Sequence, residues 1–378
     1  MSVASEAIDQ LLFETELMDS ELLFLSHFGE LKEKLAKSRN ALESGIRDSI
    51  TASDVQEAYK NARALMEGAE GFTKTHTVHM VGHAHIDLNW LWPMDETIRI
   101  CGRDFNTITR LLEKYPDFHF SQSQAALYEV TRKQYPEIYE KIKVLNKKGQ
   151  FEVTACTWSE ADLNMTGGES IAHHLVLSRD LTKSDFGKRP SICWEPDSFG
   201  HPASMPKILN KSGIKSYYHY RCGNGNPLYI WEGDDGSKVY AFNSIYLNPI
   251  LPGEIADVSM KVSKDSGVLD TVFVYGVGDH GGGPTERNIR NIYRMMESPA
   301  MPSICFNTIE GFFEAVDRQD TSRLPVIKGD LNPVFTGCYT THADIKELNR
   351  ACERSFMSEE TAAALKYILT GEKTVTKE

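Results

Sequence analysis

The sequence lacks a long apolar run, a basic cluster and any closely spaced pair of cysteines. No apolar segment approaches the ~20 residues that a membrane span needs, and the first ten residues hold two acids and no basic start of a secretory signal. The net charge of -12 would repel both the phosphates of nucleic acid and the anionic face of a membrane. We therefore expect neither a nucleic-acid partner nor membrane attachment.

The seven cysteines are scattered and odd in number. No C-x-x-C pair occurs, which argues against a disulfide framework and against a structural zinc site. A reducing, cytoplasmic location is the expectation, and the sequence leaves both a monomer and a homo-oligomer open. The cysteines are Cys101, Cys156, Cys193, Cys222, Cys305, Cys338 and Cys352.

Three regions differ in their pattern along the 378 residues. Residues 1–74 carry apolar positions at helical spacing and predict an N-terminal helical segment. Residues 75–343 alternate short β-rich runs with helical stretches, which predicts an α/β domain, and seven or eight such units favour a closed, seven-stranded β/α barrel over an open sheet. Residues 344–378 are helical again and predict the start of a further domain. The expected strands are 77–81, 118–121, 151–155, 191–194, 216–220, 239–242, 271–275 and 303–306.

The first of these strands is followed by His83, His85 and Asp87, two residues apart. An extended backbone points alternate side chains to one face, so the three could meet a single ion. Imidazole and carboxylate ligands together suit zinc. The competing interpretation is a set of hydrogen-bonded residues at a strand end, and we favour metal binding because the carboxylate completes the pattern.

Two more acids, Asp197 and Asp279, also stand just after the ends of later predicted strands. The carboxyl ends of parallel barrel strands meet at one rim, so both acids should converge on the metal triplet. Either aspartate could instead cap the next helix. A pair of carboxylates about 5 Å apart is what double-displacement glycoside hydrolysis requires, one as nucleophile and one as general acid and base. A neighbouring metal would hold sugar hydroxyls and keep Asp197 ionised.

Other segments carry weaker signals. The loop 276–281 matches G-x-G-x-x-G after a strand, but Pro284 delays the helix and a nucleotide site is disfavoured, although the glycines could surround the anion of a phosphorylated sugar. Trp158, Glu160 and Asp162 could bind sugar, or form an ordinary polar loop. Arg221 could orient the nucleophile, or form a surface ion pair.

The segments 82–90 (GHAHIDLNW) and 194–201 (WEPDSFGH) resemble glycoside hydrolase family 38, the retaining α-mannosidases. The resemblance covers residues 77–349 and implies a seven-stranded β/α barrel followed by a helical bundle and β-sandwich domains. Only the first part of that architecture would be present, so the chain is expected to be a truncated form.

The resemblance also implies roles for individual residues. It makes His85, Asp87 and Asp197 zinc ligands, with His342 as the fourth ligand and His280 or His201 as alternatives. Asp197 would also be the nucleophile, and the segment 278–285 makes Asp279 the acid/base. The substrate-binding residues would be Trp90, Phe199 and Arg221, to which the local pattern adds Trp158 and Asp162.

The leading hypothesis is zinc-assisted hydrolysis of an α-mannoside, either a simple mannoside or a mannose-containing oligosaccharide. A zinc-dependent deacetylase or amidohydrolase is an alternative, because H-x-H-x-D barrels also activate a metal-bound water. An inactive carbohydrate-binding fragment is a third.

Overall fold

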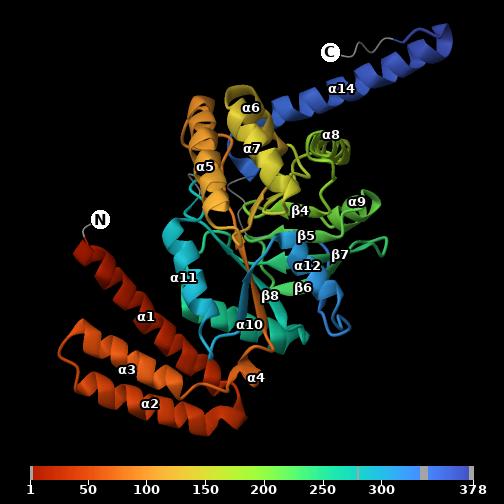
Figure 1. The fold of residues 1–378 in the computed structure, drawn as a ribbon. Coiled ribbons are helices and arrows are strands. Elements are labelled where there is room, and N and C mark those ends of the chain that lie inside the picture. Colours follow the sequence, from red (N-terminus) through yellow and green to blue (C-terminus); the bar gives the residue numbers. More distant parts are fainter. Residues whose placement is uncertain (1–2, 279–280, 333–338, 374–378) are drawn as a thin grey trace.

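The computed structural model describes residues 3–278, 281–332 and 339–373. Helices and strands alternate through the central part of the chain, between a helical lobe at the N-terminal end and a single helix at the C-terminal end (Figure 1). The helices are α1 (Val3–Ser26), η1 (Gly29–Leu31), α2 (Lys32–Arg47), α3 (Ala52–Ala64), α4 (Glu70–Thr73), α5 (Met94–Lys114), α6 (Ala125–Gln134), α7 (Pro136–Lys147), α8 (Gly168–Phe186), α9 (Met205–Lys211), α10 (Pro252–Ser266), α11 (Glu286–Met296), α12 (Ile309–Asp317) and α14 (Ala343–Thr370). The strands are β1 (Thr77–Gly82), β2 (Phe120–Gln122), β3 (Phe151–Val153), β4 (Ile192–Glu195), β5 (Ser216–His219), β6 (Leu228–Glu232), β7 (Lys238–Asn243), β8 (Asp270–Tyr275), β9 (Ser303–Phe306) and β10 (Val326–Lys328).

The first sheet is parallel throughout and is organised around β1. Strand β8 pairs with β1 along its whole length, from Thr77 to Gly82. On the other edge, β9 pairs with the first four residues of β1, and β2 pairs with its last residue before continuing to β3. All but the first residue of β1 are buried, as expected for a parallel strand that is covered on both faces.

The second sheet has the order β10-β6-β7-β5-β4 and is mixed. Strands β6 and β7 form an antiparallel pair, while the other neighbours are parallel. The predicted α/β class is confirmed, but the predicted closed barrel of seven strands is not found in the described residues. Two features account for this. Strands β2 and β3 contain three residues each, and β6 and β10 extend the other sheet beyond the strands that the sequence predicted.

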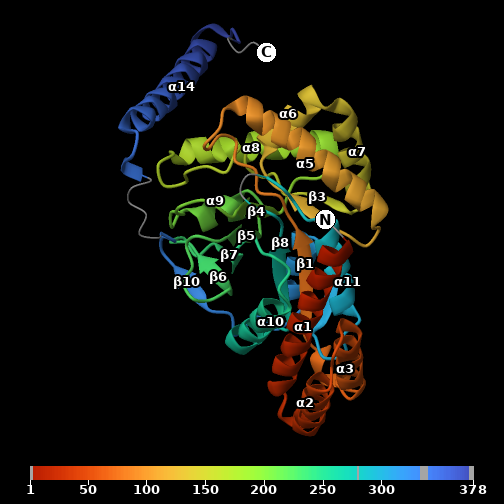
Figure 2. The same ribbon diagram turned by 90° about the vertical axis from the view of Figure 1, so that its left-hand side faces the viewer.

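The two sheets share no continuous ladder in the described residues, but Val81 and Val274 of the first pack in one cluster with Trp194 and Phe242 of the second. A single isolated bridge between Asn248 and Tyr275 links the chain after β7 to the end of β8. Helices α5, α6 and α7 pack on the first sheet (Figure 2). From α5, Phe105 is fully buried with Phe120 and Phe151, and each such ring contributes about 1.5–3 kcal/mol by leaving water.

The helical lobe and α14 lie at opposite ends of the molecule (Figure 1). In the lobe, Met18 and Leu25 of α1 pack with Leu42 of α2 and Tyr59 of α3. Helix α14 has no buried residue, and it contacts α8 where Glu353 accepts a hydrogen bond from the Gly167 amide at 2.8 Å. No helix in the described ranges is long and apolar enough to cross a membrane.

Candidate active site

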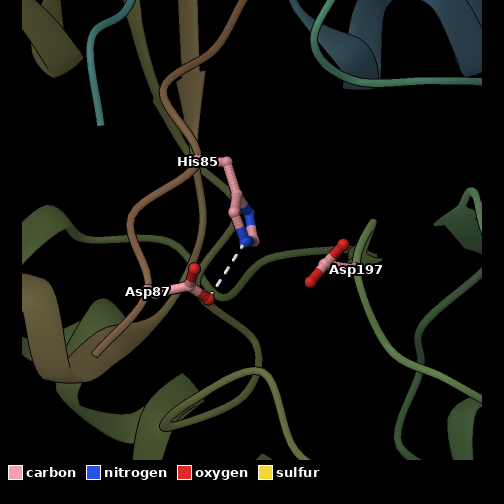
Figure 3. A group of neighbouring side chains, drawn as sticks. All are labelled: His85, Asp87 and Asp197. Atoms are coloured by element: carbon pink, nitrogen blue, oxygen red, sulfur yellow. Dashed lines mark ion pairs between the residues drawn. The ribbon is translucent and has the colours of Figure 1, made fainter. Parts of the chain in front are cut away.

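Three side chains gather where the ends of β1 and β4 approach each other. His85 and Asp87 follow β1, and Asp197 follows β4 on the other sheet. One potential ligand atom from each lies within 4.8 Å of the other two. Figure 3 shows the His85 ring and the Asp87 carboxylate on one side and Asp197 facing them from the other. The His85 Nε2 atom lies 3.5 Å from Asp87 Oδ1.

The atoms of this group fit a metal ion. His85 is buried, and neither of its ring nitrogens has a hydrogen-bond partner among the described residues. An unpaired buried polar atom is costly, so such a pair of nitrogens indicates a partner that the protein alone does not supply. In the part of the chain that the structure describes, the Asp197 carboxylate pairs with one guanidinium, that of Arg221, so a divalent cation would balance the remaining charge of Asp87 and Asp197. One imidazole and two carboxylates are ligands that zinc accepts.

Asp197 is held by donors from its own sheet. Its Oδ1 accepts hydrogen bonds from Arg221 Nε at 2.7 Å and from the Tyr246 hydroxyl at 2.5 Å, and it lies 2.5 Å from Arg221 Nη2. All three contacts reach the same oxygen, which leaves Oδ2 for a cation or for an electrophilic carbon. Burial lowers the pKa of Arg221, but the Asp197 carboxylate outweighs it and raises the pKa overall, so the arginine stays charged.

A third acid, Glu160, lies between the two ligand segments, and its side chain is 9% exposed. Its Oε1 accepts hydrogen bonds from the backbone amides of Asp197 and Ser198, the latter at 2.7 Å. Its Oε2 lies 3.7 Å from His85 Nδ1. Burial raises the pKa of Glu160 well above its usual value. Burial also lowers the pKa of His85, but Asp87 and the other nearby carboxylates outweigh this and raise it overall, so the site favours positive charge.

The glycine-rich segment after β8 is tied to the same loop. The Gly281 amide donates to His85 O at 3.0 Å, and the Gly282 amide donates to Asp104 Oδ2 at 2.6 Å. Gly281 has φ +75°, and a Cβ there would stand 2.3 Å from Asp104 Oδ2, so only glycine fits. Asp279 and His280 lie outside the described residues.

The profile of the Glycosyl hydrolases family 38 N-terminal domain matches residues 75–330, which include all the residues of this group. The chain belongs to glycoside hydrolase family 38. It is 33% identical over 322 residues to human Alpha-mannosidase 2C1, covering 82% of this chain and 31% of the relative. It is 32% identical over 321 residues to Alpha-mannosidase G of Dictyostelium discoideum, covering 82% and 29%.

A solved structure shows that the fold is shared. The alpha-mannosidase from Enterococcus faecalis V583 superposes with a TM-score of 0.60 at 18% identity, covering 68% of this chain and 31% of that one. The chain spans about a third of the length of the curated relatives it matches.

The structure brings several of the predicted sugar-binding residues of this family 38 domain to the site. Arg221 contacts Asp197, and its guanidinium lies over the Phe199 ring at 4.5 Å from the centroid. Trp90 is 51% exposed, and its ring meets that of Trp92 at 5.9 Å. This indole is on the loop that carries Asp87, and its contact with a sugar stays a prediction.

Trp158 and Asp162 lie on the loop after β3, on either side of Glu160. Trp158 is 36% exposed, whereas the Asp162 carboxylate accepts hydrogen bonds from the Asn164 and Met165 amides at 3.2 Å. Asp162 therefore shapes its own loop, and its contact with substrate stays a prediction.

Of the other predicted ligands, His342 and His201 are not part of this group of three, and His280 lies outside the described residues. His342 precedes α14 with φ +51°, and its side chain is 72% exposed and 4.0 Å from Asp344. His201 is buried, with Nδ1 bonded to the Tyr217 hydroxyl at 2.6 Å. His83 bonds to Ser121 O at 2.9 Å through Nδ1, and burial lowers its pKa to about 3, so it supports the metal segment as a neutral ring. The fourth ligand stays a prediction.

Sequence reasoning missed Tyr246. It comes shortly after the end of β7, just as Asp87 and Asp197 come shortly after the ends of their strands. This position was the signal that could have indicated it. Tyrosines are common in polar loops, so the residue type alone did not single it out. Glu160 was noted as a residue that could bind sugar or belong to an ordinary polar loop, whereas its carboxylate contacts Asp197, Ser198 and His85.

Proposed function

We propose that this chain is the catalytic domain of a retaining α-mannosidase that uses Asp197 as nucleophile, Asp279 as general acid and base, and a zinc ion held by His85, Asp87 and Asp197. The observation that supports this most directly is the pairing of two features. A buried group with unpaired histidine nitrogens lies beside a carboxylate whose Oδ1 is fixed by Arg221 and Tyr246. A carboxylate oriented in this way is what a nucleophile requires.

The reaction would proceed in two displacements. In the first, an Asp197 oxygen forms an ester bond to the anomeric carbon as the glycosidic bond breaks, and Asp279 gives its proton to the leaving oxygen. In the second, water loses a proton to Asp279 and attacks the anomeric carbon, which breaks the ester and releases an α-configured sugar. Arg221 and Tyr246 hold Asp197 throughout and stabilise its negative charge when it leaves.

The remaining residues would bind metal and substrate. When bound, the zinc would supply positive charge that holds hydroxyl groups of the sugar. His342 is proposed as the fourth zinc ligand, and Trp90, Phe199, Arg221, Trp158 and Asp162 as the lining of the sugar site. The substrate would be a mannoside or a mannose-containing oligosaccharide. A cytoplasmic location belongs to the same proposal and rests on the sequence.

The test measures zinc content and the first product. Purified chain should contain about one zinc per molecule by atomic absorption, and proton NMR of a hydrolysed aryl α-mannoside should show the α-anomer before mutarotation. A 5-fluoro-mannosyl fluoride should label the peptide that carries Asp197, located by mass spectrometry. Release of acetate from an N-acetylated sugar, without any mannose, would instead support the deacetylase alternative.

A further inference from the structure

The metal group is assembled from two sheets, and Glu160 is a residue that contacts both halves. It follows β3, in the sheet that provides His85 and Asp87, and it bonds to the backbone of Asp197 from the other sheet. Strands β3 and β4 are not paired in the described residues, so no sheet ladder fixes Asp197 relative to His85. The Glu160 side chain supplies a link at this point.

Glu160 is itself held by a strained residue. Gln124 has φ +62°, a left-handed conformation that costs a non-glycine residue about 1–3 kcal/mol. Its side chain accepts a hydrogen bond from the Glu160 amide at 3.2 Å and donates one to Ile86 O at 2.8 Å. Ile86 lies between the two ligands of the first sheet, so Gln124 connects their loop to Glu160. Such strain is found where the surroundings require a fixed position.

The two oxygens of Glu160 have different surroundings. Oε1 accepts the two amides of the Asp197 segment, while Oε2 faces His85 Nδ1 at 3.7 Å and has no hydrogen-bond partner among the described residues. The charge of a zinc ion at this site would keep Glu160 ionised, and a carboxylate beside Nδ1 favours the tautomer with its proton on Nδ1. The opposite nitrogen, Nε2, then presents its lone pair toward Asp87, where the metal would bind.

We infer that Glu160 is a positioning residue for the metal: Oε2 selects the His85 tautomer that binds through Nε2, while Oε1 fixes the segment that carries Asp197. The inference rests on the proposed function only in requiring that the site bind zinc. It assigns Glu160 no contact with substrate.

Glu160→Gln separates the two roles. The amide oxygen can still accept the hydrogen bonds from residues 197 and 198, so the fold and the Asp197 segment should be retained. The amide nitrogen would then face His85 Nδ1 as a donor, which favours the tautomer with its proton on Nε2 and opposes metal binding. Zinc affinity, measured by competition with a chromophoric chelator, should fall about 10- to 100-fold. The melting temperature of the metal-free protein should change little.

Glu152→Gln is the matched control. Glu152 is another acid from the β3 region whose carboxylate accepts backbone amides, but those belong to Ile309 and Glu310 at the start of α12. Zinc affinity should be unchanged in this variant. Equal zinc affinity for Glu160→Gln and wild type would overturn the inference. So would a fall in affinity accompanied by an equal fall in the melting temperature of the metal-free protein, which indicates a structural role.

A spectroscopic measurement tests the inference without a variant. In the zinc-loaded wild-type chain, ¹⁵N NMR of the His85 ring should show a protonated Nδ1 and a metal-bound Nε2. Zinc on Nδ1 would contradict the inference even if Glu160→Gln fails to fold. Failure of the proposed function has a different result, because wild-type protein would then bind no zinc at this site.

Discussion

The two sheets supply the site with side chains in opposite states. From the first sheet come His85, whose nitrogens are buried and unpaired, and Asp87 at 3.5 Å from it. From the second sheet comes Asp197, whose Oδ1 receives three contacts from Arg221 and Tyr246. The first half of the site, His85 and Asp87, has unpaired nitrogens that an ion could bind. The second half, Asp197 with Arg221 and Tyr246, holds a carboxylate in one orientation. The comparison indicates that metal binding and nucleophile orientation have separate structural supports.

The difference has a physical reason. A ligand atom must keep its lone pair free, so a hydrogen-bond donor on that atom would compete with the metal. A nucleophile that must leave again as an anion benefits from donors that are already in place, because no reorganisation is then needed during the reaction. The unpaired His85 nitrogens therefore suit metal binding, and the Asp197 Oδ1 that already has its donors suits a nucleophile whose other oxygen reacts.

Replacing one aspartate in each half should separate these tasks most strongly. Asp197→Asn removes the nucleophile, so mannosidase kcat should fall on the order of 10⁴-fold or more, and added zinc should not restore it. Asp87→Asn removes only a ligand, so zinc affinity should fall and saturating zinc should recover part of the lost activity. Steady-state kinetics over a zinc titration measure both effects.

The shared contribution of Asp197 to metal binding provides a check on this pair. Both variants should bind zinc more weakly than wild type in a chelator competition. If zinc restores Asp197→Asn as fully as Asp87→Asn, then Asp197 acts only as a ligand and the division between the two halves fails.

Tyr246→Phe should produce a smaller effect that is confined to the second half. The hydroxyl donates to Asp197 Oδ1 at 2.5 Å, and a hydrogen bond to a charged group is worth about 1.5–3 kcal/mol. We expect kcat/KM to fall about 10- to 100-fold with zinc affinity unchanged. Tyr240→Phe is the control, because it removes a tyrosine–aspartate bond to Asp317 at 3.2 Å. A large loss of zinc in Tyr246→Phe would contradict the separation.

Local patterns predicted much of the fold. The strands at 77–82, 192–195 and 270–275 stand where the buried apolar runs placed them, because burial on both faces leaves a strong signal. Helix α3 begins with a local signal of another kind. Thr51 accepts a hydrogen bond from the Asp54 amide, and the Asp54 carboxylate accepts one from the Thr51 amide, which forms a capping box just before Ala52.

Contacts between sheets were harder to predict. The spacing of His85 and Asp87 and the strand-end position of Asp197 predicted that the three lie together, and they do, although the strand ends belong to two sheets and not to the rim of one barrel. Sequence alone did not show that β3 and β4 are unpaired in the described residues, since pairing depends on how the whole sheet twists and closes. The role of Glu160 could not be predicted from its own loop for the same reason, because its contacts run between these two unpaired strand ends.

The carboxylate of Glu152, the control residue, gives a prediction about how the stability of the fold changes with pH. Burial raises its pKa to about 7 from 4.5, despite hydrogen bonds from the Ser121 hydroxyl at 2.5 Å and the α12 amides. A folded-state pKa above the unfolded value gives stability that is fully present below pH 4.5 and is lost as pH rises through about 7. The loss is at most about 3 kcal/mol, and smaller because Glu152 lines a solvent-accessible cavity. Glu152→Gln lacks this titration, so urea unfolding of both proteins should show wild type losing stability relative to the variant between pH 4.5 and 8. A constant difference across that range would mean that the pKa of Glu152 is the same in the folded and the unfolded protein, and that burial at the β3 end does not raise it.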